Sequence, residues 1–326
     1  MTTEPRLSAK KVAAVVVTHN RERLLTNCLE SLLGQTADGF GILVIDNAST
    51  DGTRQYVESL ADDRIHYHNT GRNLGGAGGF NWGIRQAMAD GYSHVWLMDD
   101  DAAPEPGAFD ALMAADSELD GQYGFLSSAT YWTDGEPSLM NLQHTTLVRK
   151  LSLDSAPADG RVRVILATFV SLFLPVGIVD ELGLPISEFF IWADDWEFTR
   201  RISRRYPCYA VLASRVVHHL PSNWPGTLAT DVPDRFWRYE YSYRNECYFY
   251  RQEGAVGVMA YLARVGLHAV RILRYAKDLR LQRLRLLAES AWGGFQFNPP
   301  VEYPTDTPSW EGALQPGLAQ AEAATA

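Results

Sequence analysis

Apolar runs and helical spacings alternate along the first hundred residues. Three β-branched or apolar runs, at 12–17, 42–45 and 95–98, predict strands buried on both faces, and a shorter strand is predicted at 64–68. Helical spacing fills the intervals between them, with helices predicted at 21–34, up to about residue 60, and at 81–89. This order predicts an α/β fold with a mostly parallel sheet and helices on its faces. The carboxyl ends of such strands meet at one edge, where ligands bind.

The second half of the chain continues the pattern and then changes character. Further elements are predicted as a helix at 105–116, a strand at 123–130, one long or two bent strands at 162–175, a helix beginning at Asp194 or Asp195, and a strand at 209–213. Residues 131–160 are polar and irregular, and they predict an excursion over the sheet. The chain thus divides into a flexible N-terminus (1–11), a main domain (12–232), C-terminal helices (233–295) and a disordered tail (296–326).

A triplet of carboxylates follows one buried strand. Asp99, Asp100 and Asp101 come directly after Val95–Met98 and before the helix breakers Pro104 and Pro106. Adjacent carboxylates repel one another unless a cation sits among them. Hard divalent cations such as Mg²⁺ or Mn²⁺ accept carboxylate oxygens and leave positions for phosphate. The sequence therefore predicts a metal site; the alternative is a solvated acidic turn that caps the next helix.

Other chemistry-bearing residues also follow predicted strands. Gly75, Gly76, Gly78 and Gly79 precede a helix, where backbone can approach a phosphate, although no Walker or dinucleotide motif is present. Asp194-Asp195 begins a helix and could simply cap it, since carboxylates are favoured there. The pair His218-His219 follows a strand and could either ligate metal or satisfy local hydrogen bonds.

Composition narrows the class of protein. Forty-six per cent hydrophobic and 21% charged residues are typical of a globular protein, and the net charge of −10 makes nucleic acid an unlikely partner. The three cysteines have no metal-ligand spacing and are expected as buried apolar residues in a reducing compartment. No apolar leader precedes Val12 and no uninterrupted apolar run reaches about 18 residues, so we expect a cytoplasmic protein without a spanning helix.

Basic residues gather near the C-terminus. Residues 257–292 alternate leucine, valine and isoleucine with seven arginines or lysines against two acids. Such a basic amphipathic segment suits the surface of an anionic membrane, and an ordinary surface helix pair is the alternative. The aromatic-rich helix at 236–250 is expected to pack on the main domain or to form a wall for a sugar acceptor.

Taken together, these motifs resemble the inverting nucleotide-sugar transferases of glycosyltransferase family 2, which have the GT-A fold. The segments VVVTHNR, VIDNASTDGT, DDD and WADDWEF and the late histidine occur in family order over roughly residues 12–220. RNLGGAGGFNWG and YSYRNECYF further resemble bacterial galactofuranosyl- and rhamnosyltransferases of cell-wall assembly.

The resemblance implies a role for each matching position. Asp99 and Asp101 with His218 would hold Mn²⁺ or Mg²⁺, with His219 as the fallback ligand. Asp195, supported by Asp194, would take the proton of the acceptor hydroxyl as general base. The donor, favoured as a UDP-sugar, would be held by Thr18, Asn20, Arg21, Asp46, Arg72, Asn73, Gly75, Asp99 and Asp100. The acceptor would meet Trp192, Trp196 and His219.

The resemblance also implies a biological setting. We expect transfer of galactofuranose from UDP-galactofuranose to a glycan or polyprenyl-linked acceptor, on the inner face of the cell membrane. Alternatives are a rhamnosyltransferase that uses dTDP-rhamnose, a nucleotidyltransferase, and a sugar-binding protein that has lost its chemistry. AVVVTHNRERL has neither the glycine nor the lysine that a nucleotidyltransferase loop needs. The sequence leaves homo-oligomerisation open.

Overall fold

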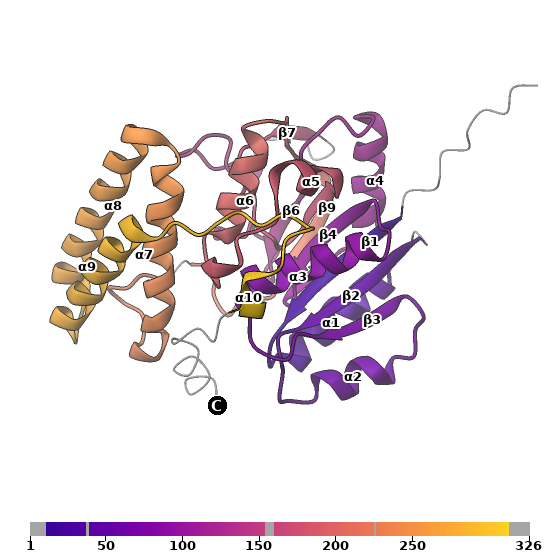
Figure 1. Cartoon of the computed structure of the whole chain (residues 1–326), viewed down its shortest axis with the longest axis horizontal. Coiled ribbons are helices and arrows are strands. Elements are labelled where there is room, and N and C mark those ends of the chain that lie inside the picture. The colour runs from indigo at the N-terminus through magenta and orange to yellow at the C-terminus, as the bar shows by residue number, and fades with distance from the viewer. Residues whose placement is uncertain (1–10, 37–38, 154–159, 225, 313–326) are drawn as a thin grey trace, which may run out of the picture.

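The computed structural model describes residues 11–36, 39–153, 160–224 and 226–312. In this part of the chain a mixed sheet lies at the centre and a group of three helices lies at one side of it (Figure 1). The strands of the sheet are β1 (Val12–Thr18), β2 (Phe40–Asp46), β3 (Ile65–Asn69), β4 (His94–Asp99), β5 (Ala102–Pro104), β6 (Leu126–Trp132), β7 (Arg161–Arg163), β8 (Leu172–Pro175) and β9 (Tyr209–His218).

Helices alternate with strands in the first part of the chain, as in an α/β fold, and the C-terminal helices are consecutive in the sequence. They are α1 (Glu22–Leu33), α2 (Thr53–Ser59), α3 (Gly75–Ala89), α4 (Ala108–Glu118), α5 (Gly177–Leu182), α6 (Asp194–Ser203), α7 (Phe236–Arg251), α8 (Gly254–Tyr275), α9 (Arg280–Gln296) and α10 (Ser309–Gly312).

The sheet is parallel on one side and mixed on the other. Its strand order is β3-β2-β1-β4-β8-β6-β9-β5, and β7 pairs with β9. The first four strands are parallel, with Thr18 opposite Asp46 and Val17 opposite Asp99. β8 then pairs antiparallel with both β4 and β6, and β5 pairs antiparallel with β9. The ends of β1, β2 and β4 therefore lie at one edge, as the sequence predicted.

Two apolar cores cover the two faces of the sheet. Alternate residues of β1 supply both: Val15 faces a core with α3, α5 and α6, and Val16 faces another with α1, α2 and α4. This period of two, inside a strand whose seven residues are all buried, is what a sheet covered on both faces requires. The predicted α/β class is confirmed, although the sheet is more mixed than the sequence suggested.

Two elements differ from the sequence predictions. The apolar segment 162–175 is divided between β7 and β8, which pair with different strands, so the two-strand alternative holds. Helix α3 begins at Gly75, so the glycine-rich segment forms its first turn and not a loop before it. Gly79 and Gly83 allow this helix to lie close to the sheet, because a Cβ there would meet Val17 or Val15 at 2.5 and 2.3 Å.

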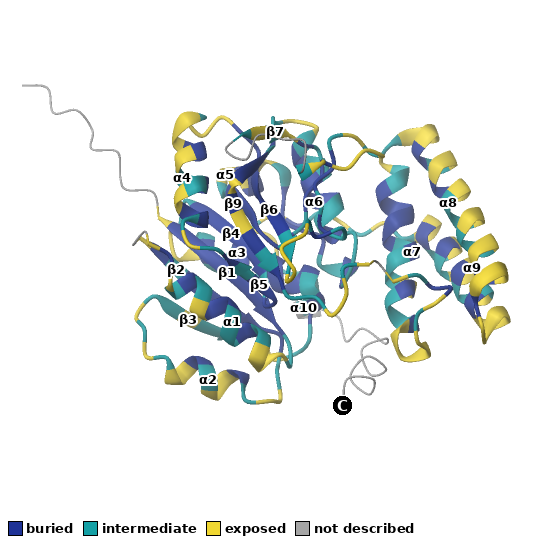
Figure 2. Ribbon diagram, turned by 180° about the vertical axis from the view of Figure 1, so that it is seen from behind, coloured by how far each residue is buried: buried dark blue, intermediate teal, exposed yellow. Residues whose placement is uncertain are grey.

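The C-terminal helices form a separate layer beside the sheet. α7 contacts α8 and α9, and Phe236, Tyr239, Tyr243, Ile272 and Leu287 make up their common core. α7 faces the main domain, whereas the outer sides of α8 and α9 are exposed (Figure 2). One helix, α8, is long and apolar enough to cross a membrane by length and composition, although the sequence has no uninterrupted apolar run of about 18 residues. α8 has 22 residues and contains an 18-residue window with a mean hydropathy of 1.4, of which 17% is buried.

The predicted disorder of the tail is wrong for residues 298–312. Glu302 is buried, and one of its carboxylate oxygens accepts hydrogen bonds from Arg85 (2.8 Å) and Asn81 (3.2 Å) of α3. Trp310 stacks on Trp82 with ring centroids 5.8 Å apart. This segment therefore crosses back over the main domain and is held by an ion pair and a ring stack. The remaining tail, 313–326, and residues 1–10 of the predicted flexible N-terminus (1–11) lie outside the described residues.

Candidate active site

Asp99, Asp101 and His218 meet at the edge where β4 and β9 end. β4 ends at Asp99, and Ala102 of β5 lies opposite His218 of β9 in the antiparallel register. That register brings the His218 Nε2 to 2.8 Å from Asp101 Oδ1, and Asn141 Oδ1 lies 2.8 Å from its Nδ1. One oxygen of each aspartate and one nitrogen of the histidine all lie within 4.8 Å of one another. Residues more than 100 positions apart thus converge on one point.

The three aspartates of this site differ in how readily they ionise. Burial, with a contribution from Asp101, raises the pKa of Asp99 to about 7. Burial also raises the pKa of Asp100 to about 6 against the opposing charge of Arg21. For Asp101 burial acts in the same direction, but the hydrogen bond and charge of His218 outweigh it and lower the pKa. Asp99 thus resists ionisation unless a cation offsets its charge, and two carboxylates with an imidazole are a donor set that fits a divalent metal ion.

Two residues predicted to hold the donor in fact hold the aspartate triplet. The Thr18 hydroxyl donates to Asp100 at 2.8 Å, and the Arg21 guanidinium bridges Asp100 and Asp101 at 3.1 and 3.2 Å. Both come from the end of β1, which lies next to β4 in the sheet. Their contacts fix the rotamers of the carboxylates, while the predicted donor contacts stay predictions.

The other predicted donor residues line the adjoining ends of β1, β2 and β3. Asn20, with a φ of 52°, links the first two ends, because its side chain accepts the Thr50 N–H at 2.7 Å. Asp46 is fully buried and accepts the Tyr67 hydroxyl at 2.5 Å and the Ser49 N–H at 2.8 Å. Burial together with that bond to Asp46 raises the pKa of Tyr67 to about 12.

Asn73 and Gly75 shape the loop before α3. The Asn73 side chain accepts the Gly75 N–H at 2.9 Å, and Gly75 has a φ of +70°. Arg72 lies in the same loop. Sequence reasoning missed Asn47, whose buried amide donates to the Gly75 carbonyl at 2.9 Å and so ties this loop to the end of β2. Its place in VIDNAST, directly after Asp46, was the available signal.

The acidic pair stands at the start of α6, after a strained loop. Phe190, Trp192 and Ala193 have φ values of 63°, 66° and 63°, a left-handed conformation that costs non-glycine residues about 1–3 kcal/mol each. We call residues 188–193 the catalytic loop, because they lead into the pair Asp194-Asp195 that is predicted to be catalytic. The loop touches the start of α3, where the Ala77 N–H donates to the Phe190 carbonyl at 3.2 Å. A Cβ on Gly75 would lie 2.2 Å from that carbonyl oxygen.

Asp194 and Asp195 interact electrostatically with the candidate metal site. We call its three residues, Asp99, Asp101 and His218, the metal cluster. Burial raises the pKa of Asp194 to about 7 and raises that of Asp195 well above its ordinary value. The charge of Asp194 also raises the pKa of Asp99, and the charge of Asp99 raises the pKa of Asp195. Asp195 Oδ1 accepts the N–H of the adjacent Trp196 at 2.7 Å, whereas the N-cap position of α6 is Ala193.

Two side chains of α7, Asn245 and Arg244, hold the catalytic loop through hydrogen bonds, and the sequence analysis did not predict this role. The fully buried Asn245 side chain donates to the carbonyls of Phe189, Ile191 and Trp192 at 2.8, 3.1 and 2.9 Å. Arg244 adds a hydrogen bond to the Glu188 carbonyl at 2.5 Å. The helical layer thereby compensates the strain of the loop that leads to Asp194. The available signal in the sequence was the polar pair Arg244-Asn245 within the aromatic segment FWRYEYSYRNECYFY.

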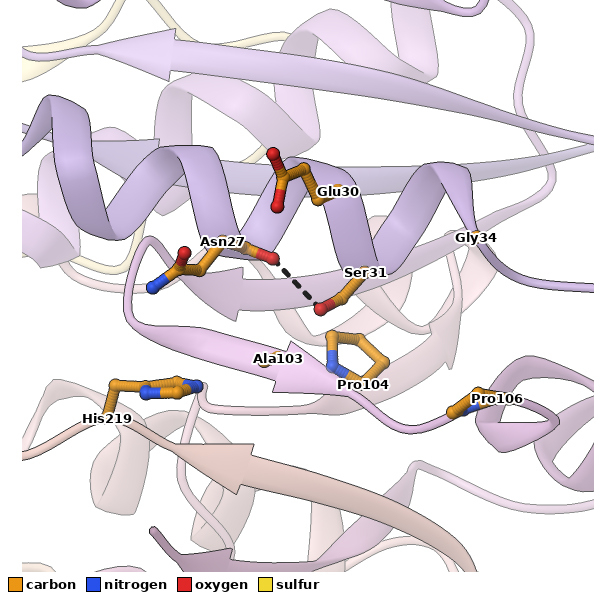
Figure 3. Close-up of a pocket in the computed structure, with 8 residues that line it drawn as sticks. All are labelled: Asn27, Glu30, Ser31, Gly34, Ala103, Pro104, Pro106 and His219. Carbon is orange, nitrogen blue, oxygen red and sulfur yellow. Dashed lines mark hydrogen bonds between the residues drawn. The ribbon is translucent and has the colours of Figure 1, made fainter.

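The predicted acceptor residues do not form one group. Trp192 packs edge-on against Tyr239 of α7 at 5.3 Å. Trp196 lies between His144 and Phe249, at 5.3 and 5.9 Å from their rings. His219 lines a pocket of about 380 Å³ against α1 and β5 (Figure 3). That pocket contains Asn27, Glu30, Ser31 and Pro104 but not the metal cluster, so His218 is the better placed of the two histidines to ligate metal.

The fold and its acidic site define a glycosyltransferase of the GT-A fold. Residues 13–145 match the family model described as glycosyl transferase family 2. The recognition made from the sequence motifs is confirmed.

Named relatives agree with this class. The chain is 28% identical over 254 residues to galactofuranosyltransferase GlfT1 of Mycolicibacterium smegmatis, covering 74% of this chain and 84% of the relative. It is 34% identical over 111 residues to a GalNAc(5)-diNAcBac-PP-undecaprenol β-1,3-glucosyltransferase of Campylobacter jejuni, covering 33% of this chain and 35% of the relative. The expectation of an enzyme, and not a sugar-binding descendant without chemistry, is thus supported.

Solved structures share the fold at low sequence identity. Staphylococcus aureus TarS, residues 1–349, superposes with a TM-score of 0.51 at 19% identity, covering 88% of this chain and 72% of that one. GalNAc-T7, solved with UDP, GalNAc and Mn²⁺, superposes with a TM-score of 0.57 at 14% identity, covering 74% and 47%. Both likenesses support the GT-A architecture.

Proposed function

We propose that this protein is an inverting, metal-dependent glycosyltransferase that moves galactofuranose from UDP-galactofuranose to a lipid-linked glycan at a membrane surface. The observation that carries the proposal is the convergence of Asp99, Asp101 and His218 with Asp194-Asp195 at one sheet edge. The similarity to GlfT1 over most of both chains favours galactofuranose as the donor sugar. The undecaprenol-linked acceptor named for the Campylobacter relative favours a lipid-linked acceptor.

Asp99, Asp101 and His218 are the residues that would hold Mn²⁺ or Mg²⁺. When bound, such an ion supplies Lewis-acid stabilisation for the negative charge of the departing nucleoside diphosphate. Thr18 and Arg21 keep the aspartates in place through their hydrogen bonds to Asp100 and Asp101. Asn73 fixes the start of α3, because its side chain accepts the Gly75 N–H at 2.9 Å.

Asp195 is the proposed general base. Its carboxylate takes the proton of the acceptor hydroxyl while that oxygen bonds to the anomeric carbon and the bond from this carbon to the diphosphate oxygen breaks. One displacement from the opposite face inverts the anomeric centre. Burial raises the pKa of Asp195, so its ionised form is a stronger base than an ordinary aspartate. Asp194, whose charge contributes to that rise, supports it.

The base assignment is tested by Asp195→Asn, which is nearly isosteric. We expect turnover to fall about 100- to 10,000-fold while UDP and metal still bind. Asp63→Asn, an exposed aspartate before β3, is the matched control and should keep wild-type turnover. Turnover of the Asp195 variant within a few-fold of wild type would refute the assignment.

Donor identity is tested by direct comparison of two sugar nucleotides. Wild-type protein with Mn²⁺ is given UDP-galactofuranose or dTDP-rhamnose, and release of the nucleoside diphosphate is followed. The proposal expects UDP-galactofuranose to be the better substrate. Preference for dTDP-rhamnose would support the rhamnosyltransferase alternative.

The outer sides of α8 and α9 are the proposed membrane-binding face. We use this name for the exposed apolar side chains Val256, Met259, Leu262, Leu267, Val270 and Leu273 of α8 and Leu281, Trp292 and Phe295 of α9, which are 36–81% exposed (Figure 2). Arg271, Arg274, Arg280 and Arg285 lie among them and are exposed. Apolar surface bordered by arginine matches the acyl boundary and anionic headgroups of a membrane.

Contacts on the inner side of α8 favour binding along the membrane surface over spanning it. Arg264 pairs with Glu246 of α7 at 2.7 Å, and the ring of His268 lies 2.9 Å from the Tyr243 hydroxyl. Gly257, Tyr261 and Ile272 are buried against the neighbouring helices. A helix that crossed a bilayer alone would lose these polar contacts.

Vesicle flotation tests the membrane-binding face. Wild-type protein should float with anionic phosphatidylglycerol vesicles and less with neutral ones, and Met259→Glu with Leu267→Glu should abolish flotation. Val148→Glu, at an apolar side chain that is 92% exposed on the main domain, should float like wild type. A double variant that floats normally would refute the face, and self-association lost in the variant would assign it to a second copy of the chain instead.

A further inference from the structure

Arg238, in the first turn of α7, is a half-buried cation with one buried nitrogen that lacks a partner among the described residues. Its Nε is buried and has no hydrogen-bond partner among the described residues. The guanidinium carbon lies 5.3 Å from the centroid of the Trp237 ring. A buried guanidinium nitrogen without an acceptor carries the cost of its lost hydration.

Positive charge accumulates around Arg238. Burial and the charges of Arg235 and Arg21 lower its pKa, and Asp231 is the acid that opposes them. The Asp231 carboxylate is already engaged, since it accepts the Tyr239 hydroxyl at 2.9 Å and lies 3.7 Å from Arg235. The first turn of α7 contains no acidic residue, and the dipole of a 16-residue helix disfavours cations there. An anion at this point would offset all three costs.

Arg238 lies near the proposed reaction centre. Trp237 contacts the ring of Phe190 in the catalytic loop, with centroids 6.2 Å apart. The charge of Arg21 lowers the pKa of Arg238, so Arg21 lies near it. Arg21 also donates hydrogen bonds to Asp100 and Asp101. Arg238 therefore stands where the helical layer, the catalytic loop and the end of β1 meet.

We propose that Arg238 and Arg235 form a diphosphate subsite that the helical layer contributes to the active site. Guanidinium groups bind phosphate oxygens in bidentate fashion, and two of them three residues apart suit a ligand with two phosphates. This inference rests on the proposed function, which offers two sources of such a group. One is the diphosphate of the donor, and the other is the diphosphate that joins a saccharide acceptor to its lipid.

Two probes separate these sources without turnover. UDP in the presence of Mn²⁺ reports the donor diphosphate, and farnesyl diphosphate reports a lipid diphosphate, both by isothermal titration calorimetry. Arg238→Gln should weaken binding of at least one probe about tenfold to a hundredfold, as expected for loss of a charge-assisted hydrogen bond. Arg238→Lys should recover part of the loss, because it keeps the charge without the bidentate fork.

The outcomes are distinct. Weaker UDP binding alone assigns the subsite to the donor, and weaker farnesyl diphosphate binding alone assigns it to the acceptor. Arg205→Gln, an exposed arginine after α6, is the matched control and should bind both probes normally. Affinities of the Arg238→Gln variant within twofold of wild type for both probes, with an unchanged melting temperature, would overturn the subsite. Failure of the wild type to turn over either sugar nucleotide would overturn the proposed function instead.

Discussion

Two buried polar side chains, Asn245 and His218, connect segments that are distant in the sequence. Asn245 alone supplies hydrogen bonds to three carbonyls of the catalytic loop, and His218 reaches both Asp101 and Asn141. The sequence indicated Asp99, Asp101, Asp194 and His218 because charged residues directly followed apolar strands. It did not indicate Asn245, since the sequence of a helix does not show which backbone carbonyls an amide side chain will contact in the folded protein.

Asn245→Asp should separate positioning from simple stability. The substitution keeps the shape but removes the amide donor, so a carboxylate oxygen would face the loop carbonyls at a cost of about 1–3 kcal/mol. We expect kcat to fall at least tenfold with little change in the affinity for UDP. Asn27→Asp on α1 is the control. Loss of stability with normal kcat, measured below the melting temperature, would contradict a positioning role.

His144 should give the stability of the protein a measurable pH dependence. It is 7% exposed, its Nδ1 has no hydrogen-bond partner among the described residues, and burial with the charge of Lys150 lowers its pKa to about 4. Between pH 6.5 and 4 the unfolded chain therefore binds a proton that the folded protein resists, and stability falls as the pH falls.

Urea unfolding across that pH range measures the effect. His144→Gln should reduce the slope of unfolding free energy against pH by up to about 1.4 kcal/mol per pH unit. His66→Gln, at an exposed histidine of β3, serves as the comparison. Equal slopes for wild type and the His144 variant would show that this ring is not protonated on unfolding.

At the scale of elements, periodicity predicted most strands and helices but not their exact ends. The helix α3 starts six residues before the predicted position, because its first turn consists largely of glycine, which propensity alone assigns to a loop. The contact with the catalytic loop explains why glycine occurs at the start of this helix, because Gly75 has no room for a side chain beside Phe190. The segment 298–312 was misjudged for the reverse reason. Its proline-rich composition hides two anchors, Glu302 and Trp310.

Two neighbouring glycines provide a matched test of the contact between α3 and the catalytic loop. Gly75→Ala would place a Cβ 2.2 Å from the Phe190 carbonyl oxygen at a φ of +70°, whereas a Cβ on Gly76 would lie 4.0 Å from that atom. We expect the first variant to lose about 1–3 kcal/mol of stability and at least tenfold in kcat, and the second to resemble wild type. Equal behaviour of the two variants would contradict the contact.

At the scale of the whole molecule, the sequence predicted the edge at which the site forms but not the full sheet. β1, β2, β3 and β4 follow from the alternating pattern and right-handed crossovers. The insertion of β8 between β4 and β6 does not, because a short apolar strand does not specify its neighbours or direction. The helical layer was predicted as helices, but its hold on the catalytic loop emerges only when distant segments pack together.

The central claim is that distant acidic residues and His218 form one metal site opposite a general base. The most direct test is anomalous diffraction from crystals soaked with Mn²⁺ and UDP. The account predicts one strong manganese peak ligated by Asp99 or Asp101 together with His218 and by the diphosphate of UDP, with the Asp195 carboxylate facing the space for the sugar. A manganese ion bound elsewhere, or UDP bound away from these residues, would contradict it.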